Sequence, residues 1–233
     1  MPVESILVAG SSRGLGLAIV KRLATSQHHV ISWSRTGAVA EVDSGSLERI
    51  AWERVDVADV TSVRAAFNSH YSNGRAIDSI IYAAGVLRTG VVGEEGAESF
   101  LRMYETNVFG AFNVLTEYVS VYGRHPKRVI GLASEACYYP SPARSGYHSS
   151  KAALASFLEC YRLEARTTGT LITLIYLGKA NTSLSSRSAE QNARALQPDQ
   201  VATVVCGLIE IPHPVEIRSL EISSVLMPYA GHG

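Results

Sequence analysis

The sequence predicts an α/β fold, a doubly wound parallel sheet of about seven strands with helices on both faces. Short β-rich runs alternate along the chain with longer segments in which apolar residues recur at helical spacing. The short runs are nearly continuous in apolar residues, which is typical of strands buried on both faces. Alternating strands and helices with right-handed crossovers favour a Rossmann-type arrangement.

Each element follows from its local pattern. Residues 6–9 are an apolar run that Gly10 ends, and the apolar residues from Leu15 to Leu23 fall on one side of a helix over residues 15–24. Further strands are expected at residues 29–33, 50–55, 79–82, 128–132, 171–177 and 216–222. Further helices are expected at residues 60–71, 100–122, 149–167 and 201–209.

Two long segments carry no element pattern. They are residues 135–146 and 178–198, and they follow the fifth and sixth strands. Long loops in compact domains are often functional, and ligands of open α/β sheets bind beyond the carboxyl ends of the strands. These loops are therefore expected to shape a ligand site.

The composition favours a globular protein and excludes several other classes. The 233 residues suit one domain over residues 1–233, with 46% hydrophobic and 18% charged residues. The 21 Lys and Arg balance the 21 Asp and Glu, so the chain has no excess positive charge that would indicate binding to nucleic acid or to an anionic membrane. The three cysteines form no disulfide or zinc pattern, so no metal is expected. With no signal-peptide pattern and no membrane span, a cytoplasmic location is expected.

The first strand-to-helix turn has the composition of a phosphate-binding loop. Residues 10–16 read G-S-S-R-G-L-G, with glycines at positions 10, 14 and 16. Glycines allow a tight turn and let a pyrophosphate approach the N-terminus of the following helix. The turn therefore indicates a dinucleotide site.

A second group of residues points to catalysis. Tyr147 and Lys151 are four residues apart, so both lie on one face if a helix starts here. Ser134 lies thirteen residues before Tyr147 at the end of the fifth strand, and Asn107 lies in the long helix after the fourth strand. With the glycine turn, this set resembles the short-chain dehydrogenase/reductase family over about residues 5 to 182.

The resemblance implies a catalytic set of Asn107, Ser134, Tyr147 and Lys151. Tyr147 would be the acid/base, although its unperturbed pKa near 10 makes it a poor base, and an ammonium from Lys151 would lower that pKa. Lys151 would also hold the nicotinamide ribose. Ser134 would donate a hydrogen bond to the substrate oxygen. Asn107 would anchor a water that connects Lys151 to solvent as a proton relay.

The resemblance also implies the cofactor, NADP(H). Ser34 and Arg35 follow the second strand, where an NAD-specific protein would have a carboxylate, and Arg13 precedes the second glycine of the turn. The guanidinium groups of Arg13 and Arg35 can pair with a 2′-phosphate. Asp56 matches the residue that accepts from the adenine amino group, although a turn carboxylate is the alternative. Thr182 matches the residue that binds the nicotinamide carboxamide. The full cofactor set is Gly10, Ser12, Arg13, Gly14, Leu15, Gly16, Arg35, Asp56, Val57, Ala84, Gly85, Tyr147, Lys151, Gly178 and Thr182.

Several residues depart from the family pattern or stay open. Leu177 replaces a usual proline, and Cys137 replaces a usual glycine, where it could line the pocket. Tyr138 and Tyr139 could shape a substrate pocket or pack against the second loop. His148 is expected on the helix surface rather than in catalysis.

The implied function is reduction of a ketone or aldehyde to an alcohol. Alternatives are an alcohol dehydrogenase working in the oxidative direction and a non-catalytic NADP(H)-binding regulator. The expected partners are a small carbonyl or alcohol substrate and a second or further copies of the chain, as a homodimer or homotetramer. Aromatic residues on the two long helices could form that contact or could be core; they are Phe109, Phe112, Tyr118, Phe157 and Tyr161.

Overall fold

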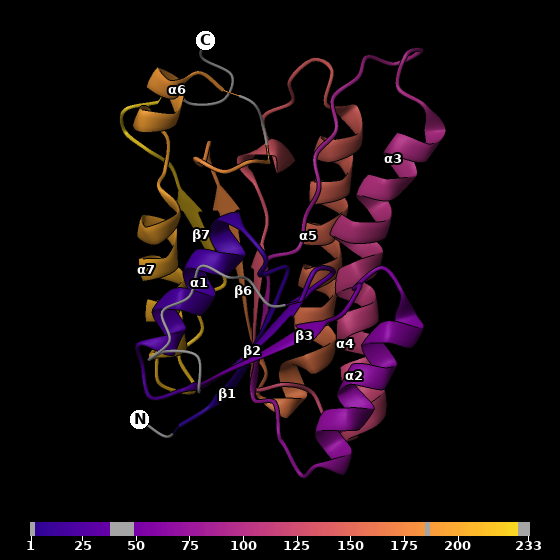
Figure 1. Cartoon of the computed structure of the whole chain (residues 1–233), viewed down its shortest axis with the longest axis vertical. Helices are drawn as coiled ribbons and strands as arrows, with labels where there is room; N and C mark the ends of the chain where they lie inside the picture. The colour runs from indigo at the N-terminus through magenta and orange to yellow at the C-terminus, as the bar shows by residue number, and fades with distance from the viewer. Residues whose placement is uncertain (1–2, 38–48, 185–186, 228–233) are drawn as a thin grey trace.

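A computed structural model describes residues 3–37, 49–184 and 187–227, in which one parallel sheet lies between two layers of helices (Figure 1). The sheet of the described residues has seven strands in the order β3-β2-β1-β4-β5-β6-β7, and every neighbouring pair is parallel. The strands are β1 (Ser5–Ala9), β2 (His29–Ser34), β3 (Ile50–Arg54), β4 (Ser79–Tyr82), β5 (Arg128–Leu132), β6 (Leu171–Leu177) and β7 (Ser219–Ile222). The predicted doubly wound α/β fold is confirmed. The single domain over residues 1–233 stays a prediction.

The helices follow the predicted alternation. They are α1 (Gly14–Ala24), α2 (Val60–Ser72), α3 (Ala97–Tyr104), α4 (Gly110–Tyr122), α5 (Ser145–Ala165), α6 (Ala189–Arg194) and α7 (Pro198–Ile209). A π-helical turn at Glu105–Phe109 joins α3 to α4, and 3₁₀ turns lie at Glu135–Cys137 and Arg166–Thr168. In the described part of the chain, no helix is long and apolar enough to cross a membrane. The cytoplasmic location stays a prediction.

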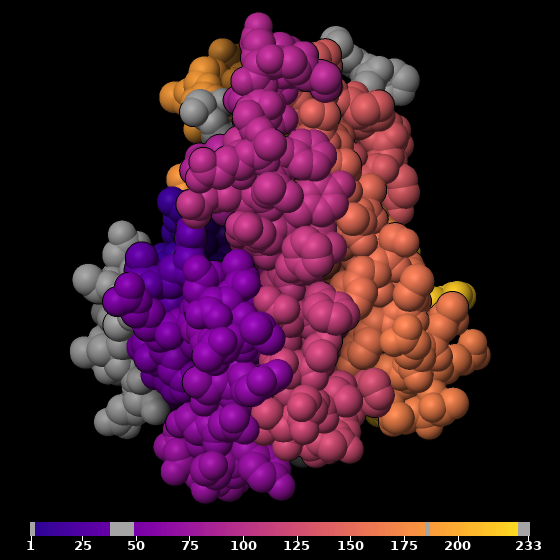
Figure 2. All heavy atoms as spheres, turned by 90° about the vertical axis from the view of Figure 1, so that its right-hand side faces the viewer, coloured from indigo at the N-terminus to yellow at the C-terminus, as the bar shows by residue number. Residues whose placement is uncertain are grey.

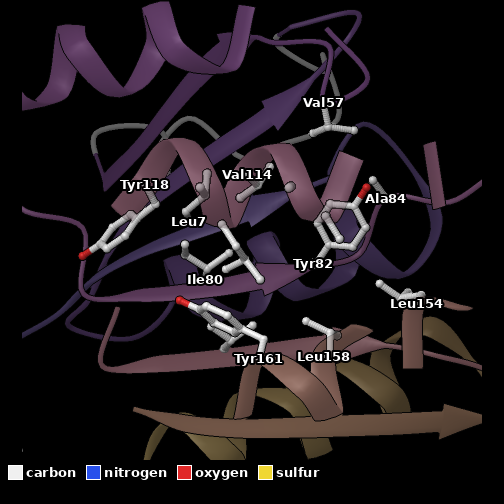
Figure 3. Close-up of a cluster of buried hydrophobic side chains, with 14 of the residues drawn as sticks. Leu7, Val57, Ile80, Tyr82, Ala84, Val114, Tyr118, Leu154, Leu158 and Tyr161 are labelled. Carbon is white, nitrogen blue, oxygen red and sulfur yellow. The ribbon is translucent and has the colours of Figure 1, made fainter. Parts of the chain in front are cut away.

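Each face of the sheet has its own hydrophobic core. Helices α1 and α7 cover one face, where Ile19 and Val205 are fully buried, and α2, α4 and α5 cover the other (Figure 1). Figure 3 shows the second core, in which Val114 and Leu158 from two helices meet Ile80 of the sheet. Burial on both faces explains why the strands are almost continuous in apolar residues.

Several elements differ from the sequence prediction. The last strand begins at Ser219 rather than at 216, because the Glu216 carboxylate accepts the backbone N–H of Ile172 where a strand partner would bind (3.2 Å). The helix that carries Tyr147 begins at Ser145, before the predicted 149. The long predicted helix begins at Ala97 and contains the π turn. The second loop contains α6, which a capping box between Ser188 and Gln191 starts.

The order of the strands reverses between β1 and β4, and this reversal places the site. The connections from β1 run to one side of the sheet and those from β4 to the other. A doubly wound sheet opens a crevice at such a switch point, beyond the carboxyl ends of the strands. The glycine turn after β1 lies at this edge, where Gly10 donates its backbone N–H to the carbonyl of Trp33 (2.8 Å).

Candidate active site

A cavity of about 640 Å³ lies at this edge of the sheet. It is lined by residues that follow β1, β2, β4, β5 and β6, and its volume is typical of a cofactor or small-molecule site. Every site residue predicted from the sequence lines this cavity except Asn107, which is fully buried. Segments that are far apart in the chain therefore meet as the resemblance predicted.

The glycine turn closes one end of the cavity, and two of its glycines have no room for a side chain. Gly10 has φ +90°, and a Cβ there would lie 2.4 Å from the Cα of Ala84. A Cβ on Gly16 would lie 2.2 Å from the carbonyl oxygen of Gly10. A Cβ on Gly14 would lie 3.3 Å from Cγ2 of Thr182, so the loop after β6 packs against the start of α1. The turn thus brings bare backbone to the cavity at a helix N-terminus.

Two arginines make this end of the cavity cationic. Arg13 and Arg35 both line the cavity and both are exposed. Ser34, the residue before Arg35, also lines the cavity, and its hydroxyl donates to the carbonyl of Gly37 (3.1 Å). Asp56 lines the cavity, and its carboxylate accepts the N–H of Ala58 in a turn (3.0 Å), as the alternative interpretation expected. Its contact with the adenine amino group stays a prediction. Asp59, not Asp56, caps α2.

Tyr147 and Ser134 meet at the other end of the cavity. Each is only 8% exposed, and the Ser134 hydroxyl, which donates to the carbonyl of Leu177 (3.4 Å), is near enough to the Tyr147 phenol to affect its pKa. The Ser134 hydroxyl also accepts the N–H of Ala136 (3.1 Å), which fixes it at the start of the turn after β5. Burial raises the pKa of Tyr147, and the neighbouring Ser134 hydroxyl opposes that rise. The Tyr147 phenol is therefore protonated at neutral pH.

Lys151 occupies the cavity wall between these two ends, but its charge acts differently from the prediction. Its ammonium donates to the carbonyl of Leu132 (2.8 Å), and burial lowers the pKa of Lys151 to about 8. The cations that lower the pKa of Tyr147 in this structure are Arg144 and Arg187. Lys151 is not among the groups that shift the pKa of Tyr147, so the expectation that its ammonium does so is corrected.

Asn107 lies in the π turn, fully buried, and ties three segments together. Its side-chain oxygen accepts the N–H of Val86 (2.8 Å), and its amide nitrogen donates to the carbonyl of Val86 (3.0 Å) and to the hydroxyl of Ser150 (2.9 Å). Ser150 in turn donates to the carbonyl of Tyr147 (2.8 Å). Asn107 therefore positions the helix turn that carries Tyr147. The water relay stays a prediction.

Residues that the sequence left open are now placed. Tyr139 lines the cavity, whereas the ring of Tyr138 packs against Tyr176 at 4.8 Å. Cys137 is not among the residues that line the cavity, so that possibility is corrected. His148 is half-buried rather than on the helix surface, because its Nδ1 bonds the carbonyl of Ala136 (2.8 Å).

Sequence reasoning missed several residues of the site, and four of them bear on its chemistry. Glu135, Arg144 and Arg187 line the cavity, and Ser150 connects Asn107 to Tyr147. Ser150 stands between Tyr147 and Lys151 in the sequence, and this position was an available signal. Nothing in the sequence spacing placed Arg187, which follows a long loop, beside Tyr147.

Comparisons with known proteins agree with this architecture, which is that of a nucleotide-binding oxidoreductase. The family model described as short chain dehydrogenase matches residues 4–193. The chain therefore belongs to the short-chain dehydrogenase family, as its motifs predicted.

Individual relatives are similar over most of the chain. The uncharacterized oxidoreductase YusZ of Bacillus subtilis is 32% identical over 78% of this chain and 67% of its own length. A probable NADP-dependent dehydrogenase of Haemophilus influenzae is 25% identical over 99% of this chain and 97% of its own. The structure of an alcohol dehydrogenase from Thermococcus sibiricus, complexed with 5-hydroxy-NADP, superposes with a TM-score of 0.83 at 20% identity, covering 97% of this chain and 99% of that one.

Proposed function

We propose that this protein is an NADP(H)-dependent oxidoreductase that reduces a ketone or aldehyde to an alcohol, with Tyr147 as the proton donor. One observation carries the proposal. Ser134, Tyr147 and Lys151 line the same cavity as the glycine turn and its two arginines. A proton donor and a phosphate-binding turn in one cavity are what hydride transfer to a carbonyl requires.

The residues fit the cofactor. Bare backbone at Gly10 and Gly16 leaves room for a pyrophosphate at the start of α1, and a side chain at either position would collide with backbone. Arg13 and Arg35 supply guanidinium groups suited to a 2′-phosphate. The names of the two relatives that mention NADP support the same choice. When bound, the cofactor supplies or accepts the hydride.

The protein's own residues handle the substrate oxygen and its proton. Tyr147 gives its phenolic proton to the carbonyl oxygen as that oxygen gains charge, and Ser134 donates a hydrogen bond to the same oxygen. Lys151 keeps a positive charge in the cavity wall. Asn107, acting through Ser150, holds the helix turn on which Tyr147 lies.

The protonated phenol of Tyr147 is the form that acts as the acid in reduction, and burial raises its pKa, so this form predominates at neutral pH. The non-catalytic regulator would need no such proton donor. NADPH consumption over a panel of ketones and aldehydes tests all three hypotheses. Turnover supports the reductase, and turnover only of alcohols with NADP⁺ supports the dehydrogenase. NADPH binding without any turnover in either direction would show a regulator.

Replacing Arg35 with aspartate is expected to reverse the cofactor preference. The change removes charge-assisted bonds to the 2′-phosphate, which are worth about 10- to 100-fold in affinity, and adds repulsion. The ratio of kcat/KM for NADPH to that for NADH should fall by at least that factor. The exposed Arg166, outside the cavity, provides the matched control Arg166→Asp. An unchanged ratio in Arg35→Asp contradicts the role of Arg35.

We further propose that the protein is a homodimer or homotetramer that uses the surface of α4 and α5. Figure 2 shows the side of the molecule where these helices lie. Phe109, which ends the π turn before α4, and Phe112 on α4 are 54% and 48% exposed. The rings of Phe112 and half-buried Phe157 lie 5.9 Å apart, which joins the two helices in one apolar surface. Tyr118 and Tyr161 are buried in the core, so they are not part of the proposed contact between copies of the chain.

Replacing Phe112 with glutamate is expected to shift the assembly toward monomer, because a charge would be buried in the apolar contact. Light scattering coupled to size exclusion at micromolar concentration measures the change. Val92, which is 89% exposed, provides the control Val92→Glu. A monomeric wild-type protein at that concentration would refute the assembly.

A further inference from the structure

The substrate end of the cavity contains two arginines that neither the glycine turn nor the catalytic set explains. Arg144 is the residue before the first turn of α5, three positions before Tyr147. Arg187 lies beyond β6 in the segment before α6. Both line the cavity with Tyr147, and both are half-buried.

The guanidinium of Arg187 is held in place by a hydrogen bond, and most of its N–H groups remain available to a ligand. Its Nη1 donates to the carbonyl of Ala180 (2.6 Å). A guanidinium has five N–H donors, so one bond leaves several for a ligand. Burial lowers the pKa of Arg187, and the charge of Arg144 lowers it further. Two cations that repel each other in a partly dehydrated cavity form a site that an anion would stabilise.

The neighbouring charges leave this end of the cavity cationic. Lys179 adds a third cation, and Glu135 is the carboxylate on the same wall. Burial raises the pKa of Glu135, against the charges of Lys179 and Arg187. Within the described residues, neither Arg144 nor Arg187 forms an ion pair with a carboxylate. Three cations therefore share this end of the cavity with one carboxylate, which leaves a net positive charge.

We propose that the substrate is a small oxo acid, whose carboxylate binds Arg144 and Arg187 while its carbonyl oxygen faces Ser134 and Tyr147. This proposal rests on the proposed function. A planar carboxylate matches the fork of an arginine side chain, which can bind both oxygens at once. In the reaction, a hydride from the reduced nicotinamide forms a C–H bond at the carbonyl carbon, and Tyr147 transfers its proton to the oxygen. The products are a hydroxy acid and the oxidised nicotinamide.

Matched pairs of an oxo acid and its methyl ester test the proposal. Acetoacetate with methyl acetoacetate, and 4-oxopentanoate with its methyl ester, differ chiefly in the charge that the arginines would bind. The wild-type kcat/KM for the acid is expected to exceed that for the ester. In Arg187→Met and in Arg144→Met this ratio should fall by about 10- to 100-fold, the loss expected for one charge-assisted pair. Because both substrates are measured on one preparation, a partly unfolded variant does not change the ratio.

A control variant and the affinity for NADPH separate a substrate role of the two arginines from a cofactor role. The exposed Arg166 lies outside the cavity, so Arg166→Met should keep the wild-type ratio. Titration of NADPH by fluorescence should give the same Kd in wild type, Arg144→Met and Arg187→Met. If Arg187→Met instead weakens NADPH binding and slows acid and ester equally, the guanidinium serves the cofactor and the proposal is wrong.

Failure of this proposal differs from failure of the proposed function. Turnover of neutral ketones or esters with no preference for the acids overturns the oxo-acid proposal and leaves the reductase in place. Absence of turnover across acids, esters and neutral carbonyl compounds, with NADPH bound, overturns the reductase and the oxo-acid proposal together.

Discussion

Replacing Tyr147 with phenylalanine is expected to lower turnover by a factor on the order of 100 or more, while NADPH binding is retained. The change removes only the hydroxyl that would give its proton to the substrate oxygen. The ring is 8% exposed and keeps its packing, so the cavity should keep its shape. Steady-state kinetics measure turnover, and fluorescence titration measures the Kd for NADPH.

Tyr139 provides the matched control, because it lines the same cavity but is not the proposed proton donor. Tyr139→Phe should lower turnover by less than about tenfold, since it removes one hydroxyl from the wall and no proton donor. Full turnover by Tyr147→Phe on a genuine substrate would rule out Tyr147 as the acid.

Replacing Lys151 with methionine is expected to lower turnover by a factor on the order of 100 and to change how stability depends on pH. Burial lowers the pKa of Lys151 from 10.5 in the unfolded chain to about 8 in the folded protein. Between these values the unfolded chain binds one proton more than the folded protein. The lysine therefore makes wild-type stability rise with pH across this window, whereas below about pH 8 the cost of burying the charge is constant.

The difference between wild type and Lys151→Met isolates this effect from the other titrating groups. The free energy of unfolding from urea titrations, measured from about pH 7 to 10, should rise in wild type relative to the variant by up to about 1.4 kcal/mol per pH unit above pH 8. Lys127 is 57% exposed and paired with Asp78, so Lys127→Met should run parallel to wild type. Parallel curves for Lys151→Met would show that the ammonium is not buried as the structure has it.

The sequence determined the order of the elements and most of the site. Burial on both faces makes a strand such as β4 apolar throughout, so its position can be read from the residues alone. The glycines at positions 10 and 16 are needed because backbone lies within 2.4 Å of where their side chains would be. Such local requirements restrict which residues can stand at a position, so they can be recognised in the sequence. A family resemblance consists of several such positions at fixed spacings along the chain.

The tertiary structure decided what depends on neighbours that are distant in the chain. The π turn at Asn107 forms where the chain meets both Val86 and Ser150, and no local pattern predicted it. The positive charges that lower the pKa of Tyr147 come from Arg144 and Arg187. Electrostatic interactions depend on distance in space and on burial, neither of which spacing along the chain provides. The sequence thus determined that a tyrosine and a nucleotide turn share a site, and only the fold showed which charges surround that tyrosine.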